Sequence, residues 1–424
     1  MAVAIGSAPP DRETKPIGPR IIKLFLIIVG VLCIYFLFYD FVKNIFMGAR
    51  YSRITNDLNE VAKAIERFQL EKGKPFEESN VDQLQGTILQ NLPRDPEGRS
   101  YLYDWFYGRL VYLGPDGVLQ TLVPGQSSPS EDGESDDVIH PVKVLDRIVY
   151  ALQEGPVAHV QIGTADGSSL KNLVDTQGQV LSLAGLTAQD ANLVAISVKR
   201  RDAIEIDILP DISADSPQLE TMTKKGSTKD EWPALYAPKN EWIYYQGSPI
   251  SGKDSNRHDI YRISYKDKIA TKLTPGDGDY IQPTAELKNK WIWYSGRPGE
   301  SGGNYALYRF QLTNYSTPEK VIVLPGSDVK APAPSPNGNY VAYLVTSSGR
   351  TRLEVRDVKG REILFTKDDV WPGSRIVWSP DERKIGYLTQ VQGSPRITLS
   401  HVMKKITVIP PGLPSTVAFT WLHE

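Results

Sequence analysis

Hydrophobic positions follow three different patterns along the chain. Residues 24–39 form an apolar run without a charged side chain. Beyond this run, apolar residues recur at alternating spacings of four and three, the spacing of one helix face. They are Ile54, Leu58, Val61, Ile65 and Phe68. From about residue 147 onwards, short apolar and aromatic segments alternate with turn residues, as strands do. The pattern predicts one long helix followed by a large β region.

The apolar run predicts a single transmembrane helix over residues 21–46. As a helix, residues 24–39 would rise about 24 Å, which is short of the ~30 Å hydrocarbon core of a bilayer, so the flanking apolar residues are needed. No small-x-small cleavage site of a signal peptide follows the run, so we expect an uncleaved anchor. Basic residues flank both ends, and the positive-inside rule therefore does not decide the orientation.

Three segments that follow the anchor resemble a known family. The helical stretch 49–75 ends in Lys72-Gly73-Lys74-Pro75, where a glycine and then a proline stop a helix. The sequence LPRDPEGRSYLY occupies residues 92–103, and VYLGPDG occupies residues 111–117. In this order, the segments resemble those of type II secretion pseudopilins and type IV pilin-like proteins. The resemblance implies a small pilin-like domain over residues 47–125, on a helix that leaves the membrane unbroken.

The same resemblance implies an orientation. Residues 1–20 would be a cytoplasmic tail, residues 21–46 would cross the cytoplasmic (inner) membrane once, and the bulk of the chain would be periplasmic or otherwise extracytoplasmic. The chain departs from the family where the leader is cut, between Gly and Phe or Met, with Glu at the fifth mature position. Here Gly18 precedes Pro19, and the fifth position is Lys23. We therefore expect the leader to be retained.

The segment 126–137 (QSSPSEDGESDD) has no apolar residue and many acidic, Ser and Gly residues. On composition alone it is a solvated acidic linker. The corresponding loop of major pseudopilins binds calcium, so the resemblance implies Asp136 and Asp137 as candidate ligands. Carboxylate oxygens are ligands that Ca²⁺ prefers. Both interpretations stay open at this point.

Six similar segments recur in the remainder of the chain at steps of 44 to 50 residues. Such a period is in or near the range typical of propeller blades. The segments are 147–150, 192–195, 242–245, 291–294, 340–343 and 384–387. With about four strands in each repeat, they predict a six-bladed β-propeller over residues 138–424. Residues 415–421 repeat the first strand of a blade, and we expect them to complete the first blade and close the ring.

The repeats also resemble a known family of propellers. The sequences WSPD at 378–381, SPNG at 335–338 and IYRIS at 260–264 are similar to repeats of TolB-like propellers, most clearly from residue 230 onwards. The predicted fold class is thus α+β and membrane-anchored: a long N-terminal transmembrane helix with a pilin-like small sheet, then an all-β six-bladed propeller.

Composition excludes several classes of function. Lys and Arg number 48 against 50 Asp and Glu, so no overall positive field would attract nucleic acid. The only cysteine, Cys33, excludes a disulfide within the chain and a cysteine-based metal site. The G-x-S-x-G match at 299–303 lies between strands rather than at a strand-to-helix elbow, and the five histidines have no metal-ligand spacing. We therefore predict no catalytic residue, no enzyme activity and no cofactor except calcium.

Aromatic residues near strand ends suggest a binding face. Aromatic anchors are enriched in protein interfaces, whereas the alternative is that these rings pack between blades. The candidate partner-binding residues are Trp232, Tyr236, Trp371, Trp378 and Trp421.

The predicted function is a membrane-anchored propeller for protein–protein interaction, as a subunit of a secretion, pilus-like or other envelope assembly. The alternative is a tethered propeller that binds or cleaves cell-wall polysaccharide or peptide.

Overall fold

The computed structural model describes residues 19–72, 75–116, 137–142, 147–165, 167, 170–188, 191–214, 216–223, 225–226, 228–236, 242–252, 256–274, 276–286, 290–299, 303–359, 361–410 and 413–422. For some of these, chiefly residues 19–28, 30–38 and 40–45, only the backbone is described. Contacts divide the described residues into two compact units, with the main division between residues 142 and 147.

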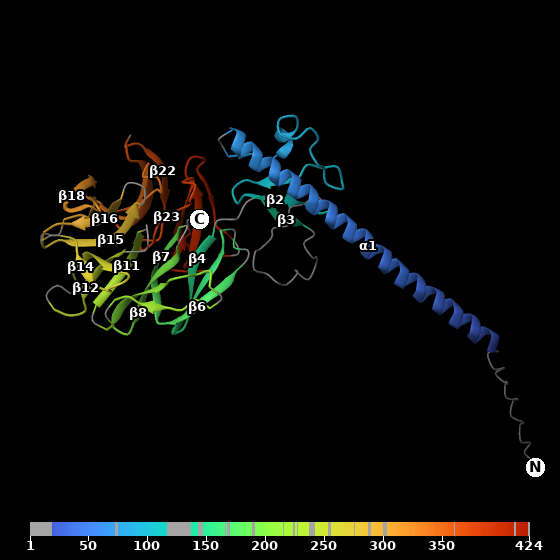
Figure 1. The fold of residues 1–424 in the computed structure, drawn as a ribbon, viewed down its shortest axis with the longest axis horizontal. Helices are drawn as coiled ribbons and strands as arrows, with labels where there is room; N and C mark the ends of the chain where they lie inside the picture. The colour runs from blue at the N-terminus through green and yellow to red at the C-terminus, as the bar shows by residue number, and fades with distance from the viewer. Residues whose placement is uncertain are drawn as a thin grey trace, which may run out of the picture. The chain divides into compact units, whose positions relative to one another are not determined.

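The first unit contains one long helix and a small sheet. Helix α1 (Pro19–Lys72) is continuous (Figure 1). After it come the 3₁₀ helix η1 (Val81–Leu84) and the strands β1 (Leu102–Asp104), β2 (Arg109–Tyr112) and β3 (Val138–Pro141). The strands form an antiparallel sheet in the order β1-β2-β3. Because β3 pairs with β2, it belongs to the first unit, whereas the repeats predicted a propeller that begins at residue 138.

The predicted helical stripe of α1 forms the core of the first unit. Ile54, Leu58, Val61 and Ile65 are buried together with side chains of η1 and β2, and Phe68 packs against the same cluster. Each buried aliphatic side chain contributes about 1.5–3 kcal/mol by leaving water. The predicted stripe is therefore confirmed, and α1 ends at Lys72, where the Gly-Lys-Pro sequence begins.

The transmembrane helix predicted over residues 21–46 lies within the N-terminal half of α1, where most side chains fall outside the description. In the part of the chain that is described, no helix is long and apolar enough to cross a membrane.

The second unit consists of groups of four antiparallel strands. Four groups are separate sheets. Their strands are β27 (Phe419–Trp421), β4 (Arg147–Glu154), β5 (Val157–Thr164) and β6 (Lys171–Gln177); β15 (Asp279–Glu286), β16 (Trp291–Arg297), β17 (Ala306–Gln311) and β18 (Asn314–Ile322); β19 (Asp328–Pro334), β20 (Tyr340–Ser347), β21 (Arg350–Asp357) and β22 (Ile363–Asp368); β23 (Val377–Trp378), β24 (Lys384–Val391), β25 (Ser394–His401) and β26 (Ile406–Val408).

Two further groups share one eight-stranded sheet. They are β7 (Gln179–Ala188), β8 (Ala191–Arg200), β9 (Ala203–Leu209) and β10 (Glu220–Thr221), and β11 (Thr228–Tyr236), β12 (Trp242–Pro249), β13 (Asp259–Ser264) and β14 (Ala270–Lys272). One parallel pairing, Lys229 with Ile204, joins β11 to β9. The described part of the second unit thus contains six groups of four strands, which is a propeller-like arrangement.

The first group is completed by the C-terminal end of the chain. Strand β27 pairs with β4, from Phe419 with Tyr150 to Trp421 with Ile148, and Figure 1 shows the C-terminus beside β4. This pairing joins the last strand of the chain to the first group of four, so the ring is closed by hydrogen bonds. The prediction that residues 415–421 complete the first blade is confirmed.

The six predicted repeat segments all lie in the second strand of a group, namely β4, β8, β12, β16, β20 and β24. Both faces of these strands are covered because hydrophobic clusters lie between successive groups. One cluster joins Tyr244 of β12 to Tyr294 of β16, and another joins Trp293 of β16 to Tyr343 of β20. Burial on both faces explains why the segments are continuously apolar or aromatic rather than alternating.

Candidate functional site

The first strand of every group lies at the centre of the ring. These strands are β27, β7, β11, β15, β19 and β23, and each contacts the next in this order, with β23 contacting β27 again. All six contribute to the lining of one cavity, which has a volume of about 100 Å³. The cavity therefore lies on the axis of the ring. It is the candidate functional site, and we refer to it as the axial cavity.

Bulges shape the first strands of three successive groups. Register shifts occur in β11 between Glu231 and Ala234, and at the equivalent places in β15 and β19. At each bulge a residue with positive φ precedes a proline: Trp232 (φ 52°), Gln282 (φ 57°) and Ala331 (φ 51°). Positive φ is uncommon outside glycine, and a bulge is where a strand tolerates proline. Because the same bulge recurs in β11, β15 and β19, it is a regular part of these inner strands rather than a local irregularity.

At two of the bulges, a backbone N–H group that is not paired within its own sheet donates to a glutamine side chain. The backbone N–H of Gln282 donates to Oε1 of Gln246 at 2.8 Å. In turn, the N–H of Ala331 donates to Oε1 of Gln282 at 2.8 Å. Each bond crosses from one group to the next, so the two bonds link three of the six groups. Buried amides are thereby satisfied, and the strands that line the axial cavity are held in place.

The wall of the axial cavity is made of small side chains. An alanine from each of four first strands faces it: Ala184, Ala234, Ala285 and Ala333. Ala234 and Ala333 directly follow the bulge prolines, whereas Thr284 takes this position in β15 and Ala285 comes one residue later. Larger residues in this lining would fill the axis. Thr284 and Thr420 add hydroxyl groups to the lining. The Thr420 Oγ1 accepts a hydrogen bond from the N–H of Gly185 at 3.0 Å.

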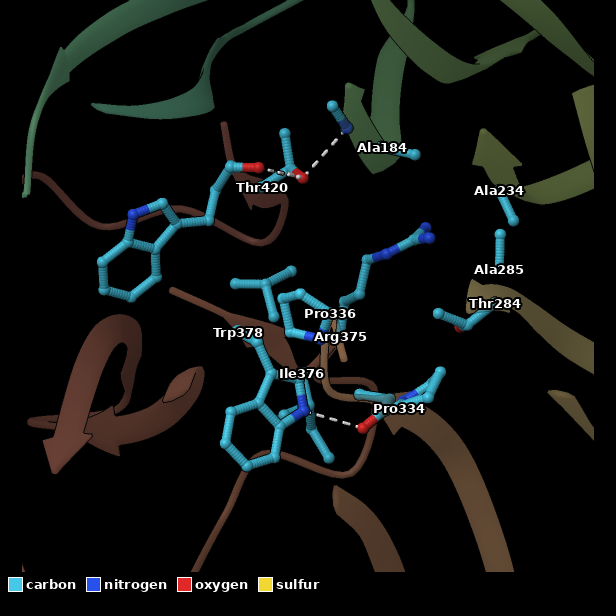
Figure 2. Close-up of a pocket in the computed structure, with 14 residues that line it drawn as sticks. Ala184, Ala234, Thr284, Ala285, Pro334, Pro336, Arg375, Ile376, Trp378 and Thr420 are labelled. Carbon is cyan, nitrogen blue, oxygen red and sulfur yellow. Dashed lines mark hydrogen bonds between the residues drawn. The ribbon is translucent and has the colours of Figure 1, made fainter. Parts of the chain in front are cut away.

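Arg375 is the only charged residue in the lining of the axial cavity, among the side chains that are described. In Figure 2 its side chain extends into the space framed by Ala184, Ala234 and Ala285. Its Nη1 donates to Ser182 Oγ at 3.1 Å, and its guanidinium lies 5.2 Å from the ring centroid of Trp232. Burial lowers the pKa of Arg375 to about 9, which leaves it charged at neutral pH.

The backbone that carries Arg375 is fixed on both sides. The preceding Ser374 is buried, and its Oγ accepts from the N–H of Leu388 at 2.8 Å. The following Ile376 is buried in a hydrophobic cluster with Trp378. Because both neighbours are held, the arginine is directed to the axis by the fold.

Two of the predicted partner-binding residues are placed differently from the expectation of an exposed aromatic rim. Trp378 is 3% exposed and Trp421 is 1% exposed. The indole N–H of Trp378 donates to the carbonyl of Ala333 at 2.8 Å (Figure 2). Both are buried residues of β23 and β27 that line the axial cavity. The ring of Trp378 stacks on Tyr340 of the preceding group, with 6.0 Å between the ring centroids, so for Trp378 the alternative of packing between blades is the correct one.

The other predicted partner-binding residues have different surroundings. Trp232 is partly buried and stacks on Arg375. Trp371 is partly buried, and its backbone N–H donates to Leu388. Tyr236 ends β11, but its side chain lies outside the description. For these three residues, partner binding stays a prediction.

The predicted calcium site also stays a prediction. Asp136 lies outside the described residues, and Asp137 is partly buried just before β3. Within the described parts of the chain, no three His, Cys, Asp or Glu side chains come close enough to hold a metal ion.

In the first unit, the segments that carried the pilin-like resemblance meet around one turn. Residues 95–98 form a turn with Asp first, Pro second and Gly last, where each is favoured. The buried Asp95 Oδ1 accepts from the N–H groups of Glu97 at 3.0 Å and Arg99 at 2.6 Å. Tyr112 of β2 donates to Glu97 at 3.0 Å and accepts from Arg50 of α1 at 2.6 Å. The turn thus ties α1 to the sheet.

Sequence reasoning missed Arg375 and the axial cavity. Neither has a local motif, because the axis exists only once the ring is closed. A small residue directly after the x-Pro dipeptide in three successive repeats, namely Ala234, Thr284 and Ala333, was a usable signal, since it indicates limited space.

Comparison with known proteins shows the fold of the second unit. No protein-family model and no curated protein matches the chain. TolB from Acinetobacter baumannii is similar in structure, with a TM-score of 0.53 and 15% identity, over 66% of this chain and 67% of that chain. A protein described as TolB from Agrobacterium tumefaciens has a TM-score of 0.36 and 20% identity, over 55% and 87%. Oligogalacturonate lyase from Vibrio parahaemolyticus has a TM-score of 0.42 and 7% identity, over 62% and 78%.

The first of these similarities confirms that the C-terminal part of the chain has a TolB-like β-propeller fold. At this level of identity, the likeness concerns the fold alone. The resemblance of the N-terminal part to pseudopilins stays a prediction.

Proposed function

We propose that this protein is a non-enzymatic, membrane-anchored binding protein. It presents its β-propeller outside the cytoplasm for protein–protein interaction, as a subunit of a secretion, pilus-like or other envelope assembly. The observation that carries the proposal is the axial cavity, whose described lining is mainly small or apolar, with one cation and no acidic or histidine side chain. Such a lining suits holding a group of another molecule, since proton transfer needs an acid or base at the site.

The first unit supports the anchoring part of the proposal. Helix α1 continues without a break from the apolar run into the core of the small sheet. The turn at 95–98 joins the sheet to α1 through Arg50 and Tyr112. A helix that is fixed in this way could serve as a stalk, and the apolar run at its N-terminal end is the proposed membrane anchor.

Anchoring and orientation can be tested in membranes of the native host. The wild-type chain and a variant lacking residues 21–46 are extracted with alkaline carbonate. We expect the wild type to stay with the membrane and the variant to be released, because the apolar run supplies the membrane affinity. Protease added to spheroplasts should digest the propeller and spare an N-terminal tag. Release of the wild-type chain would refute the anchor, and a mature N-terminus at Pro19 would refute the retained leader.

The interaction part of the proposal is tested with a photo-crosslinking amino acid at two positions. Pro336 lines the axial cavity after β19, and Lys359 is exposed in the turn between β21 and β22. In native membranes we expect a discrete crosslinked protein from position 336 and none of the same mass from position 359. Equal products from both positions, or no protein product from position 336, would contradict a partner at the axis. A crosslink to polysaccharide would instead favour the alternative, a tethered propeller that binds cell-wall material.

A further inference from the structure

The axial cavity has an unbalanced charge. Arg375 carries a guanidinium with five N–H donors, of which one is used by Ser182. Among the described residues no carboxylate forms an ion pair with Arg375. Its guanidinium makes a cation–π contact with Trp232, with 5.2 Å between Cζ and the ring centroid. Arg375 is partly buried, and withdrawing a cation even partly from water without a counter-charge is costly. An anion in the cavity would remove this cost.

Two buried indole donors of the inner strands lack an acceptor among the described residues. The Nε1 atoms of Trp232 and Trp421 are both buried, with no hydrogen-bond partner among the described residues. Trp421 lines the axial cavity, and Trp232 stacks on Arg375. Buried donors are normally satisfied. The unused N–H groups of Arg375 are therefore the donors that a group in the cavity would meet, and they suit a group that accepts hydrogen bonds.

The size and lining narrow the chemistry of that group. A volume of about 100 Å³ is several times the ~15 Å³ that one water molecule needs. Alanine, proline and aliphatic side chains such as Ile376 and Val377 make up much of the wall. A phosphate can carry two charges and has more acceptor sites than a single arginine can satisfy. A carboxylate on a short aliphatic stem matches one guanidinium and an apolar wall.

We propose that the axial cavity binds a carboxylate group through Arg375, with the aliphatic stem of the ligand against the alanines of the first strands. The carboxylate could come from a free short-chain acid or from the C-terminus of a peptide, which share this chemistry. The inference does not depend on the membrane anchor or on the envelope assembly proposed above.

The test uses the full-length protein in detergent micelles and two probes, butyrate and a tetrapeptide with a free C-terminal carboxylate. Binding is measured by ligand-observed NMR titration. We expect wild type to bind at least one probe saturably, and Arg375→Gln to bind it about tenfold to a hundredfold more weakly, because a charge-assisted pair is lost. Arg375→Lys should be intermediate, since it keeps the charge but not the planar fork. Arg350→Gln, an exposed arginine at the start of β21, should bind like the wild type.

The arms of the experiment distinguish the two sources. Binding of butyrate alone identifies a small free acid, whereas a peptide that binds only without C-terminal amidation identifies a chain terminus. If Arg375→Gln does not fold, as judged by circular dichroism, Ala285→Leu gives the same test by filling the cavity while Arg375 is kept. Absence of saturable binding to the wild type, or unchanged binding to a folded Arg375→Gln or Ala285→Leu variant, would overturn the proposal.

Discussion

At the scale of single residues, Asp279 at the start of β15 shows how the propeller holds a buried charge. Its Oδ1 accepts from the backbone N–H of His258 at 2.9 Å, and its Oδ2 lies 3.2 Å from Nη2 of Arg297. The hydroxyl of Tyr305 donates to the same carboxylate. Burial alone would raise the pKa of Asp279, but the hydrogen bonds from His258 and Tyr305 outweigh it and lower the pKa to about 2.

This lowered pKa predicts how stability depends on pH. The folded pKa lies below the unfolded value of 3.8, so the carboxylate stabilises the fold by about 2 kcal/mol above pH ~4. The contribution is lost as the pH falls towards 2. We expect Asp279→Asn to lower the free energy of unfolding of the propeller by about this amount at pH ~5 and by little at pH ~2. Urea unfolding followed by tryptophan fluorescence at both pH values measures the difference.

A nearby aspartate provides the control. Asp277 is 82% exposed and lies 3.5 Å from Arg257, so Asp277→Asn should change stability by less than about 0.5 kcal/mol at either pH. If Asp279→Asn and Asp277→Asn behaved alike, the network around Asp279 would not stabilise the fold.

The positions and roles of single side chains were harder to predict from the sequence than the helices and strands were. Trp378 and Trp421 were assigned to an exposed rim from their positions near turns, but both lie at the axis, where the ring encloses them. Arg375 carries no signal in its neighbours and gains its position from ring closure. Information about the axis is spread over six repeats, and no single stretch of sequence contains it.

At the scale of elements, helix α1 offers two leucines in contrasting surroundings. Leu58 is fully buried in the core of the first unit, whereas Leu70 is 85% exposed. We expect Leu58→Ala to destabilise the first unit by about 2–5 kcal/mol, because it leaves a cavity. Leu70→Ala should change it by less than about 0.5 kcal/mol. The two variants are compared by thermal unfolding, followed by circular dichroism at 222 nm, where the signal of the helix dominates. Similar melting temperatures of Leu58→Ala and Leu70→Ala would argue against packing of this helix face.

Strand β27 makes a second contrast. Phe419 pairs with β4 through its backbone, and its buried ring lies next to Gly386 of β24. Val417, two residues earlier, is 40% exposed. Phe419→Ala should cost about 3–5 kcal/mol because it removes a large side chain from the strand that closes the ring. Val417→Ala should cost less than about 1 kcal/mol. Limited proteolysis reports on closure, since an open first group would expose β4 to cleavage; equal resistance of both variants would contradict a closing role for β27.

The strands and the helix could be predicted from the sequence because their hydrophobic patterns recur several times along the chain. All six apolar segments proved to be second strands, and the stripe from Ile54 to Phe68 proved to be the buried face of α1. The assignment of β3 could not be predicted in the same way. Its four residues follow the acidic segment, and their pairing with β2 is a long-range choice without a local pattern.

At the scale of the whole molecule, the two units have separate cores. The cluster in the first unit draws on residues between Ile54 and Val142. The clusters of the second unit draw on residues from Val149 onwards. Clusters that share no side chain among the described residues can unfold in separate cooperative steps.

We therefore expect differential scanning calorimetry of the full-length protein in detergent to show two unfolding transitions. Leu58→Ala should lower the midpoint of one transition and Phe419→Ala that of the other, because each removes contacts from one core only. For a unit of the propeller's size, about 1 kcal/mol shifts the midpoint by roughly 2–4 °C, so a loss of 3–5 kcal/mol is easily resolved. The double variant should shift both midpoints by the amounts seen singly, as distant sites do. A single transition that both substitutions move together would show that the units unfold as one, and stability measured for either would then belong to the whole chain.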